Sequence, residues 1–94
     1  MPDAEIHWPS VDGSRYAGQV WAIEVELTPK PLGRTIRIMN EMLSPLRYTQ
    51  VVYLIAPAAR SVVTRAAAAL PAEDQARLAV RDLPESALAW QARS

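Results

Sequence analysis

Residues 3–8 and 20–28 alternate between apolar and polar side chains, which is the periodicity of a β-strand. One face of the two strands is predicted to be dry and carries Ala4, Ile6, Trp8, Trp21, Ile23, Val25 and Leu27. The other face is predicted to be wet and carries Asp3, Glu5, His7, Ala22, Glu24, Glu26 and Thr28. Because the residues from Pro9 to Gly18 are rich in turn formers, we expect the two strands to form an antiparallel hairpin.

A helix is predicted after the second strand, because Pro29 and Pro31 are favoured near a first helical turn. Apolar side chains follow at helical spacing, namely Leu32, Ile36, Met39 and Leu43. Ser44-Pro45 ends this helix, since the residue before a proline avoids the helical conformation.

The second half of the chain predicts a strand, a helix and a last strand. Residues 50–56 are nearly all apolar and β-prone, which is typical of a central strand covered on both faces. Residues 58–70 predict a helix whose inner stripe is Val62, Val63, Ala66 and Leu70. Residues 77–83 predict a strand that ends at Pro84, and residues 85–92 predict a short helix or a tail.

The predicted order is strand-strand-helix-strand-helix-strand. A helix between two strands implies a crossover and a parallel pair. We therefore expect an α/β fold near the α+β border, with a small mixed sheet in which an antiparallel hairpin precedes helix-linked strands. The 94 residues form one predicted domain, 1–94, whose thin core favours a homo-oligomer such as a dimer, or a partner chain.

Composition excludes several classes of protein. Half of the residues are apolar, which is too many for a disordered chain. The chain has no cysteine, so it holds neither a disulfide nor a thiolate metal site. No apolar run approaches the ~20 residues of a membrane helix, and Met-Pro-Asp-Ala-Glu does not begin a signal peptide. We expect a cytoplasmic protein without a membrane partner.

The net charge of zero hides an uneven distribution. Residues 1–28 carry five carboxylates and one arginine, whereas residues 29–65 carry one carboxylate and six basic side chains. An acidic segment followed by a basic one suits a site that binds a cation beside a phosphate backbone. The alternative is that the arginines simply solvate helix faces.

The second strand carries the candidate chemistry. Side chains two residues apart on a strand share a face, so Glu24 and Glu26 project together, and Asp3 could lie across the hairpin from them. Neighbouring carboxylates repel one another unless a cation or water compensates their charge. Mg²⁺ takes such oxygen ligands together with waters and phosphates. The alternative is an ordinary solvated sheet face.

Pro2-Asp3-Ala4 and residues 22–30, Ala-Ile-Glu-Val-Glu-Leu-Thr-Pro-Lys, resemble the PD-(D/E)xK nuclease superfamily. More loosely, residues 2–48 resemble nuclease-like domains of actinobacterial proteins linked to plasmids and mobile elements. The resemblance covers residues 2–56. It implies a restriction endonuclease-like core, Mg²⁺ or Mn²⁺ as cofactor, and DNA as substrate. The superfamily also places a helix and a strand before the Asp, so this front part is expected to be missing, supplied by a partner chain, or truncated through the choice of start codon.

The resemblance also implies roles for individual residues. Asp3 and Glu24 match the metal-binding acids, while Glu26 stands where the superfamily has its lysine and could be a third ligand. Lys30, four residues later, could supply the missing ammonium, which makes Asp3, Glu24, Glu26 and Lys30 the predicted catalytic set. Predicted phosphate contacts come from the following helix, at Arg34 and Arg37.

Three hypotheses follow. The first is a metal-dependent endonuclease-like domain that acts on DNA. The second is a catalytically degenerate relative that binds nucleic acid or assembles with proteins, which Glu26 in the lysine position favours. The third is an unrelated α/β interaction protein whose acidic strand face is only solvated.

Overall fold

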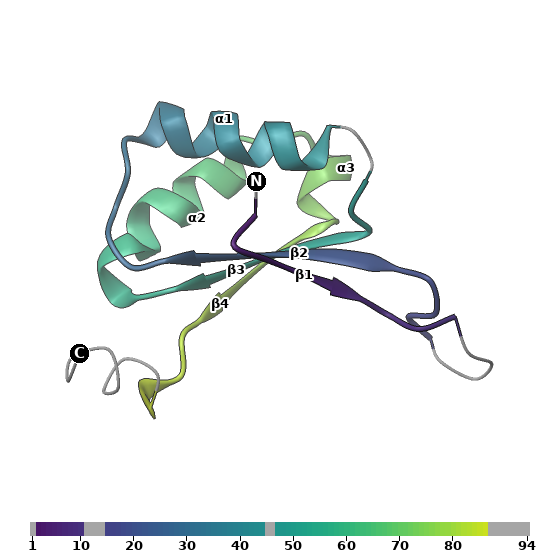
Figure 1. Ribbon diagram of the computed structural model, residues 1–94. Coiled ribbons are helices and arrows are strands. Elements are labelled where there is room, and N and C mark those ends of the chain that lie inside the picture. The colour runs from purple at the N-terminus through teal and green to yellow at the C-terminus, as the bar shows by residue number, and fades with distance from the viewer. Residues whose placement is uncertain (1, 11–14, 45–46, 87–94) are drawn as a thin grey trace.

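The computed structural model describes residues 2–10, 15–44 and 47–86 (Figure 1). Its elements in chain order are β1 (Ala4–His7), β2 (Val20–Glu26), α1 (Leu32–Leu43), β3 (Gln50–Ile55), η1 (Pro57–Ala59), α2 (Arg60–Ala68), α3 (Ala72–Gln75) and β4 (Leu78–Asp82). The predicted order of strands and long helices is confirmed. The predicted second helix begins with the 3₁₀ turn η1, and the short helix α3 was not predicted. The predicted helix or tail at 85–92 lies mostly outside the described residues.

The four strands form one mixed sheet in the order β1-β2-β3-β4. Strand β1 pairs antiparallel with β2, whereas β2 pairs parallel with β3 and β3 pairs parallel with β4. This arrangement is the α/β fold expected from the sequence, with a hairpin followed by helix-linked strands.

Helices cover one face of the sheet. In the described part of the chain, α1, α2 and α3 all lie on the same side of the strands (Figure 1). The reason is topological: β2, β3 and β4 follow one another without a reversal, and right-handed crossovers then bring both connecting helices to the same face. The expectation that β3 is covered on both faces was therefore wrong, and its outer residues Val52 and Leu54 are only half-buried.

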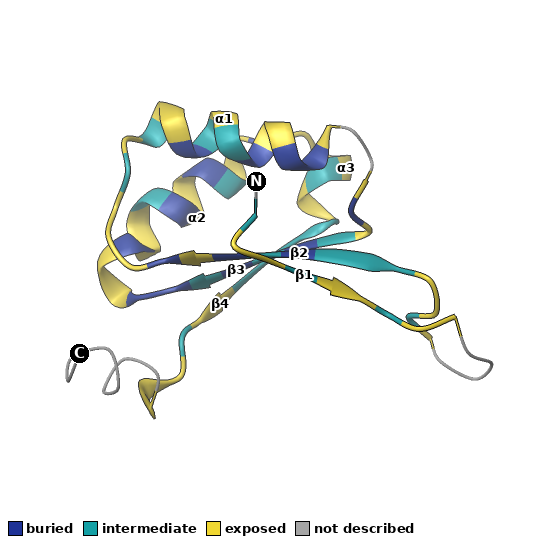
Figure 2. Cartoon of the chain, in the orientation of Figure 1, coloured by how far each residue is buried: buried dark blue, intermediate teal, exposed yellow. Residues whose placement is uncertain are grey.

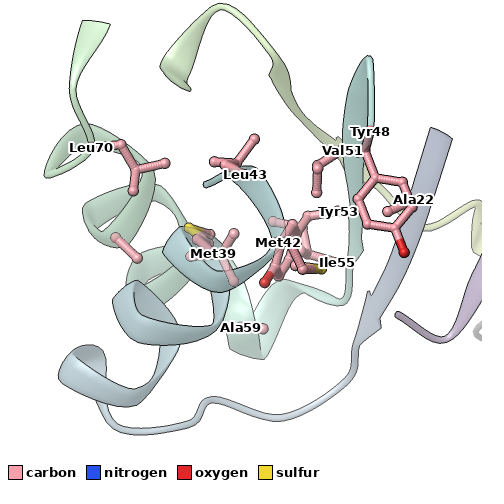
Figure 3. Packing of buried hydrophobic residues seen from close by; sticks show 12 residues of the cluster. Ala22, Met39, Met42, Leu43, Tyr48, Val51, Tyr53, Ile55, Ala59 and Leu70 are labelled. Atoms are coloured by element: carbon pink, nitrogen blue, oxygen red, sulfur yellow. The ribbon is translucent and has the colours of Figure 1, made fainter. Parts of the chain in front are cut away.

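The core lies between the sheet and the helices. Its fully buried larger side chains come from α1, β3 and α2, and they are Met39, Leu43, Val51, Tyr53, Ile55 and Val63 (Figure 3). Small residues on the second helical segment, Ala59 and Ala66, are also fully buried. Because Ala59 and Ala66 have short side chains, α1 and α2 can approach each other closely over the sheet. Figure 2 shows the result as buried inner sides on both helices and exposed outer sides.

The two faces of β2 are exchanged relative to the prediction. The alternation is correct, but the face with Ala22, Glu24 and Glu26 lies under the helices and is buried, although it was predicted to be wet. The apolar face predicted to be dry is open, and Val25 is 38% exposed. The prediction from hydropathy was wrong for β2. The crossover helices decide which face of the strand is covered, whatever the polarity of its side chains.

No helix among the described residues is long and apolar enough to cross a membrane.

Candidate functional site

Glu24 of β2 and Tyr53 of β3 lie side by side on the sheet face covered by the helices, and the exposed Asp3, which precedes β1, lies next to Glu24. Ala4 pairs with Ile23 in the antiparallel register, so the preceding Asp3 lies opposite Glu24. Glu24 in turn pairs with Tyr53 in the parallel register. The backbone N–H of Val25 donates a hydrogen bond of 2.8 Å to Asp3 Oδ2, which holds the Asp3 side chain beside β2. The predicted proximity of Asp3 and Glu24 is therefore confirmed.

Glu24 is a buried carboxylic acid, with 7% of its surface exposed. Burial, and then the charge of Asp3, raise its pKa to about 7, against a hydrogen bond from the Asp3 backbone that lowers it. The charge of Glu26 raises this pKa further, while the charge of Lys30 lowers it. Glu24 and Asp3 thus form a carboxylate pair without an ion-pair partner among the described residues.

Glu26 is compensated by Lys30. The Lys30 ammonium donates a hydrogen bond of 2.6 Å to Glu26 Oε1, from a position between β2 and α1. Lys30 reaches back toward the acidic face, as expected from its place four residues after Glu26. This geometry brings an ammonium group next to Glu26.

The Tyr53 hydroxyl group is a part of this site that no sequence pattern predicted. Tyr53 is 1% exposed, and its hydroxyl group has no hydrogen-bond partner in the described part of the protein. Burial raises the pKa of Tyr53, and Glu24 and then Glu26 and Asp3 raise it further. The available signal was a single hydroxyl-bearing aromatic within the otherwise apolar segment 51–56.

Arg34 and Arg37 lie on α1 and are exposed. Neither of these two arginines forms an ion pair with Asp3, Glu24 or Glu26 in residues 2–10, 15–44 and 47–86. Their role as phosphate contacts stays a prediction.

A separate polar cluster surrounds Glu5. Its carboxylate accepts hydrogen bonds from Tyr48 and His7, and Arg47 Nη2 lies 3.3 Å from Oε2. The hydrogen bond from Tyr48, followed by that from His7, lowers the pKa of Glu5, and the same bond raises the pKa of Tyr48. This cluster joins β1 to the segment before β3, and His7 belongs to it rather than to the pair of Asp3 and Glu24.

The described side chains include no group of three or more His, Cys, Asp or Glu residues arranged to hold a metal ion. The assignment of Asp3, Glu24 and Glu26 as a three-carboxylate ligand set stays a prediction. The donors nevertheless fit a hard cation, because Mg²⁺ is commonly bound through one or two carboxylates, with waters and substrate phosphates completing its shell. Asp3, which directly precedes β1, and Glu24 of β2 supply two such carboxylates.

Comparisons of the chain with known protein families, with curated proteins and with solved structures gave no match.

Proposed function

We propose that the chain is a metal-dependent nuclease-like domain that acts on DNA phosphodiesters in the cytoplasm. One observation carries the proposal: Asp3 lies opposite the buried Glu24, and neither carboxylate has a cationic partner among the described residues. Holding two such groups together is unfavourable unless a cation binds them or one is protonated. The order β1-β2-α1-β3 agrees with the restriction endonuclease-like core that the sequence motif implies.

Asp3 and Glu24 would hold Mg²⁺ or Mn²⁺, with Glu26 as the predicted third ligand. When bound, the ion supplies Lewis acidity toward a phosphate oxygen and lowers the pKa of a coordinated water molecule. The hydrogen bond from Lys30 to Glu26 holds the Lys30 ammonium group beside these carboxylates. A positive charge in this place stabilises negative charge that develops on a phosphate. The exposed Arg34 and Arg37 would contact flanking phosphates and position the DNA.

Cleavage of DNA tests the proposal. Supercoiled plasmid and single-stranded DNA are incubated with the protein and Mn²⁺ or Mg²⁺, with EDTA as the metal-free control. We expect nicking that needs the metal and falls at least ~100-fold in Glu24→Gln. Glu41→Gln, which changes an exposed carboxylate on α1, should cleave at the wild-type rate. Absence of cleavage with every metal and substrate would contradict catalysis by this chain.

A second candidate function is an assembly module without catalysis, and the open sheet face favours it. The face turned away from the helices carries no buried side chain among the described residues, and it includes Ile6, Ile23, Val25, Val52 and Leu54. Trp8, Tyr16 and Trp21 extend this surface, with ring centroids 4.9–5.2 Å apart. Parallel sheets are normally covered on both faces, and large apolar patches are typical of interaction sites.

A further inference from the structure

One buried hydroxyl group next to the candidate site lacks a hydrogen-bond partner. It belongs to Tyr53, which lies among the core side chains with Met42 and Ile55 (Figure 3). Buried polar groups are nearly always paired in folded proteins, because an unpaired group loses its hydrogen bonds to water and gains none in return. A hydroxyl group kept in this position therefore calls for a functional explanation, since phenylalanine would fill the same space without the cost.

The place of Tyr53 in the sheet suggests that explanation. Tyr53 and Glu24 are direct partners in the parallel register of β2 and β3. Their side chains leave the same face of strands that lie ~4.8 Å apart. Both residues are buried, so water competes little for a hydrogen bond between them.

Tyr53 is suited to be the donor in this pair. A phenolic hydroxyl group carries one proton that it can donate in a hydrogen bond. An ionised carboxylate accepts hydrogen bonds and donates none. The chemistry is therefore complementary whenever Glu24 is ionised.

We propose that Tyr53 is a positioning residue whose hydroxyl group donates a hydrogen bond to one carboxylate oxygen of Glu24 while the other oxygen binds the divalent cation. The inference rests on the proposed function, because it assigns Tyr53 a role at the same site. Outer-shell hydrogen bonds orient the ligands of a metal, and their removal typically costs about 10- to 100-fold in affinity. Tyr53 touches neither the cation nor the substrate in this arrangement and acts through Glu24.

Tyr48 provides a matched control. It is also buried, but its hydroxyl group already donates a hydrogen bond to Glu5. Loss of the Tyr48 hydroxyl group should therefore lower stability and leave metal binding intact. Loss of the Tyr53 hydroxyl group should do the reverse.

The experiment combines two measurements on wild type, Tyr53→Phe and Tyr48→Phe. Urea unfolding in EDTA measures stability without metal, and calorimetric titration with Mn²⁺ measures affinity. We expect Tyr53→Phe to keep or raise the urea midpoint and to bind Mn²⁺ about 10- to 100-fold more weakly. We expect Tyr48→Phe to lower the midpoint and to keep the wild-type affinity. In a Glu24→Gln background, Tyr53→Phe should have no further effect on Mn²⁺ binding, because its target is gone.

Three outcomes of these measurements would overturn the role of Tyr53. Wild-type Mn²⁺ affinity in Tyr53→Phe would overturn the positioning role while leaving the proposed metal site intact. A lowered urea midpoint in Tyr53→Phe would show that the hydroxyl group serves the metal-free fold, which also overturns the inference. Absence of Mn²⁺ binding to wild type would overturn the proposed function and this inference together.

Discussion

Glu24 is a carboxylate that the fold buries beside a second carboxylate, Asp3. Burial and like charge both oppose its ionisation, so this position costs free energy at neutral pH. Residues that oppose stability in this way are expected where function requires them. The ionisation of Glu24 should therefore affect the stability of the protein in the absence of any substrate.

The pH dependence of stability should change when Glu24 is replaced by glutamine. The folded protein keeps the Glu24 proton up to a pKa of about 7, whereas the unfolded chain releases it near 4.5. Ionisation of Glu24 thus lowers the free energy of unfolding as pH rises through this window. We expect Glu24→Gln to be more stable than wild type by about 1–2 kcal/mol at pH 8, with partial solvent screening included. Near pH 4 the two proteins should be equally stable.

Urea unfolding of both proteins in EDTA across this pH range measures the difference. A difference that is independent of pH would contradict the raised pKa of Glu24.

Lys30 should contribute more to stability than a surface cation with the same ion-pair distance. The Lys30–Glu26 and Arg60–Asp82 pairs both measure 2.6 Å, but their side chains are 36% and 8% exposed in the first pair and 56% and 60% exposed in the second. Lys30→Met leaves a buried carboxylate uncompensated, and we expect a loss of about 1–3 kcal/mol. Arg60→Met should lose less than about 1 kcal/mol. Equal losses in chemical denaturation would argue that Glu26 is solvated.

At the level of helices and strands, α1 and α2 pack on one face of the sheet and form the hydrophobic core with it. Leu43 and Met39 of α1 are fully buried between α2 and the sheet, and Ala66 of α2 allows the close approach. This layer also covers Glu24 and Tyr53. The candidate site therefore depends on helix packing as well as on its own residues.

Leu43→Ala should destabilise the protein by about 2–5 kcal/mol, because it removes transfer free energy and leaves a cavity in the core. Ile38→Ala on the same helix should cost less, since Ile38 is only partly buried. Unfolding in urea compares the two variants directly. A larger loss in Ile38→Ala would contradict the observed orientation of α1.

Local sequence patterns predict the helices and strands better than they predict how these elements pack together. The stripe of Leu32, Ile36, Met39 and Leu43 predicts α1, and the apolar segment 50–56 predicts β3, because these are local periodicities. The short α3 was missed since its four residues are fewer than a periodicity needs. Which face of β2 is covered depends on the handedness of two crossovers, and Glu24 and Val25 do not encode it locally.

The candidate site was predicted only in part, for similar reasons. The motif and the alternation placed Asp3 beside Glu24, and the four-residue spacing suggested that Lys30 returns toward Glu26. Tyr53 is distant in sequence from all of them. Its pairing with Glu24 follows from the register of β2 with β3, which no local pattern reveals.

At the scale of the whole molecule, the sheet has one covered face and one open face in the described residues (Figure 2). Ile6, Val25 and Leu27 are exposed large apolar side chains, two of them on the β1–β2 hairpin. A hairpin and two parallel strands with an apolar outer face favour association with another surface. The expected homodimer would use this face.

Val25→Glu tests the open face without touching the covered one. We expect wild type to sediment as a concentration-dependent dimer and Val25→Glu to sediment as a monomer, because a charge at the centre of an apolar interface is costly. Arg37→Glu changes the charge of the opposite layer and should dimerise as wild type does. A monomer at all concentrations in wild type would contradict the homodimer.

Calorimetric titration of Mn²⁺ and Mg²⁺ into the EDTA-treated and dialysed protein tests whether Asp3 and Glu24 form a cation site. We expect saturable binding to wild type that weakens at least ~10-fold in Glu24→Gln and is unchanged in the control Glu41→Gln. Absence of binding to wild type, or equal binding to wild type and Glu24→Gln, would contradict the claim.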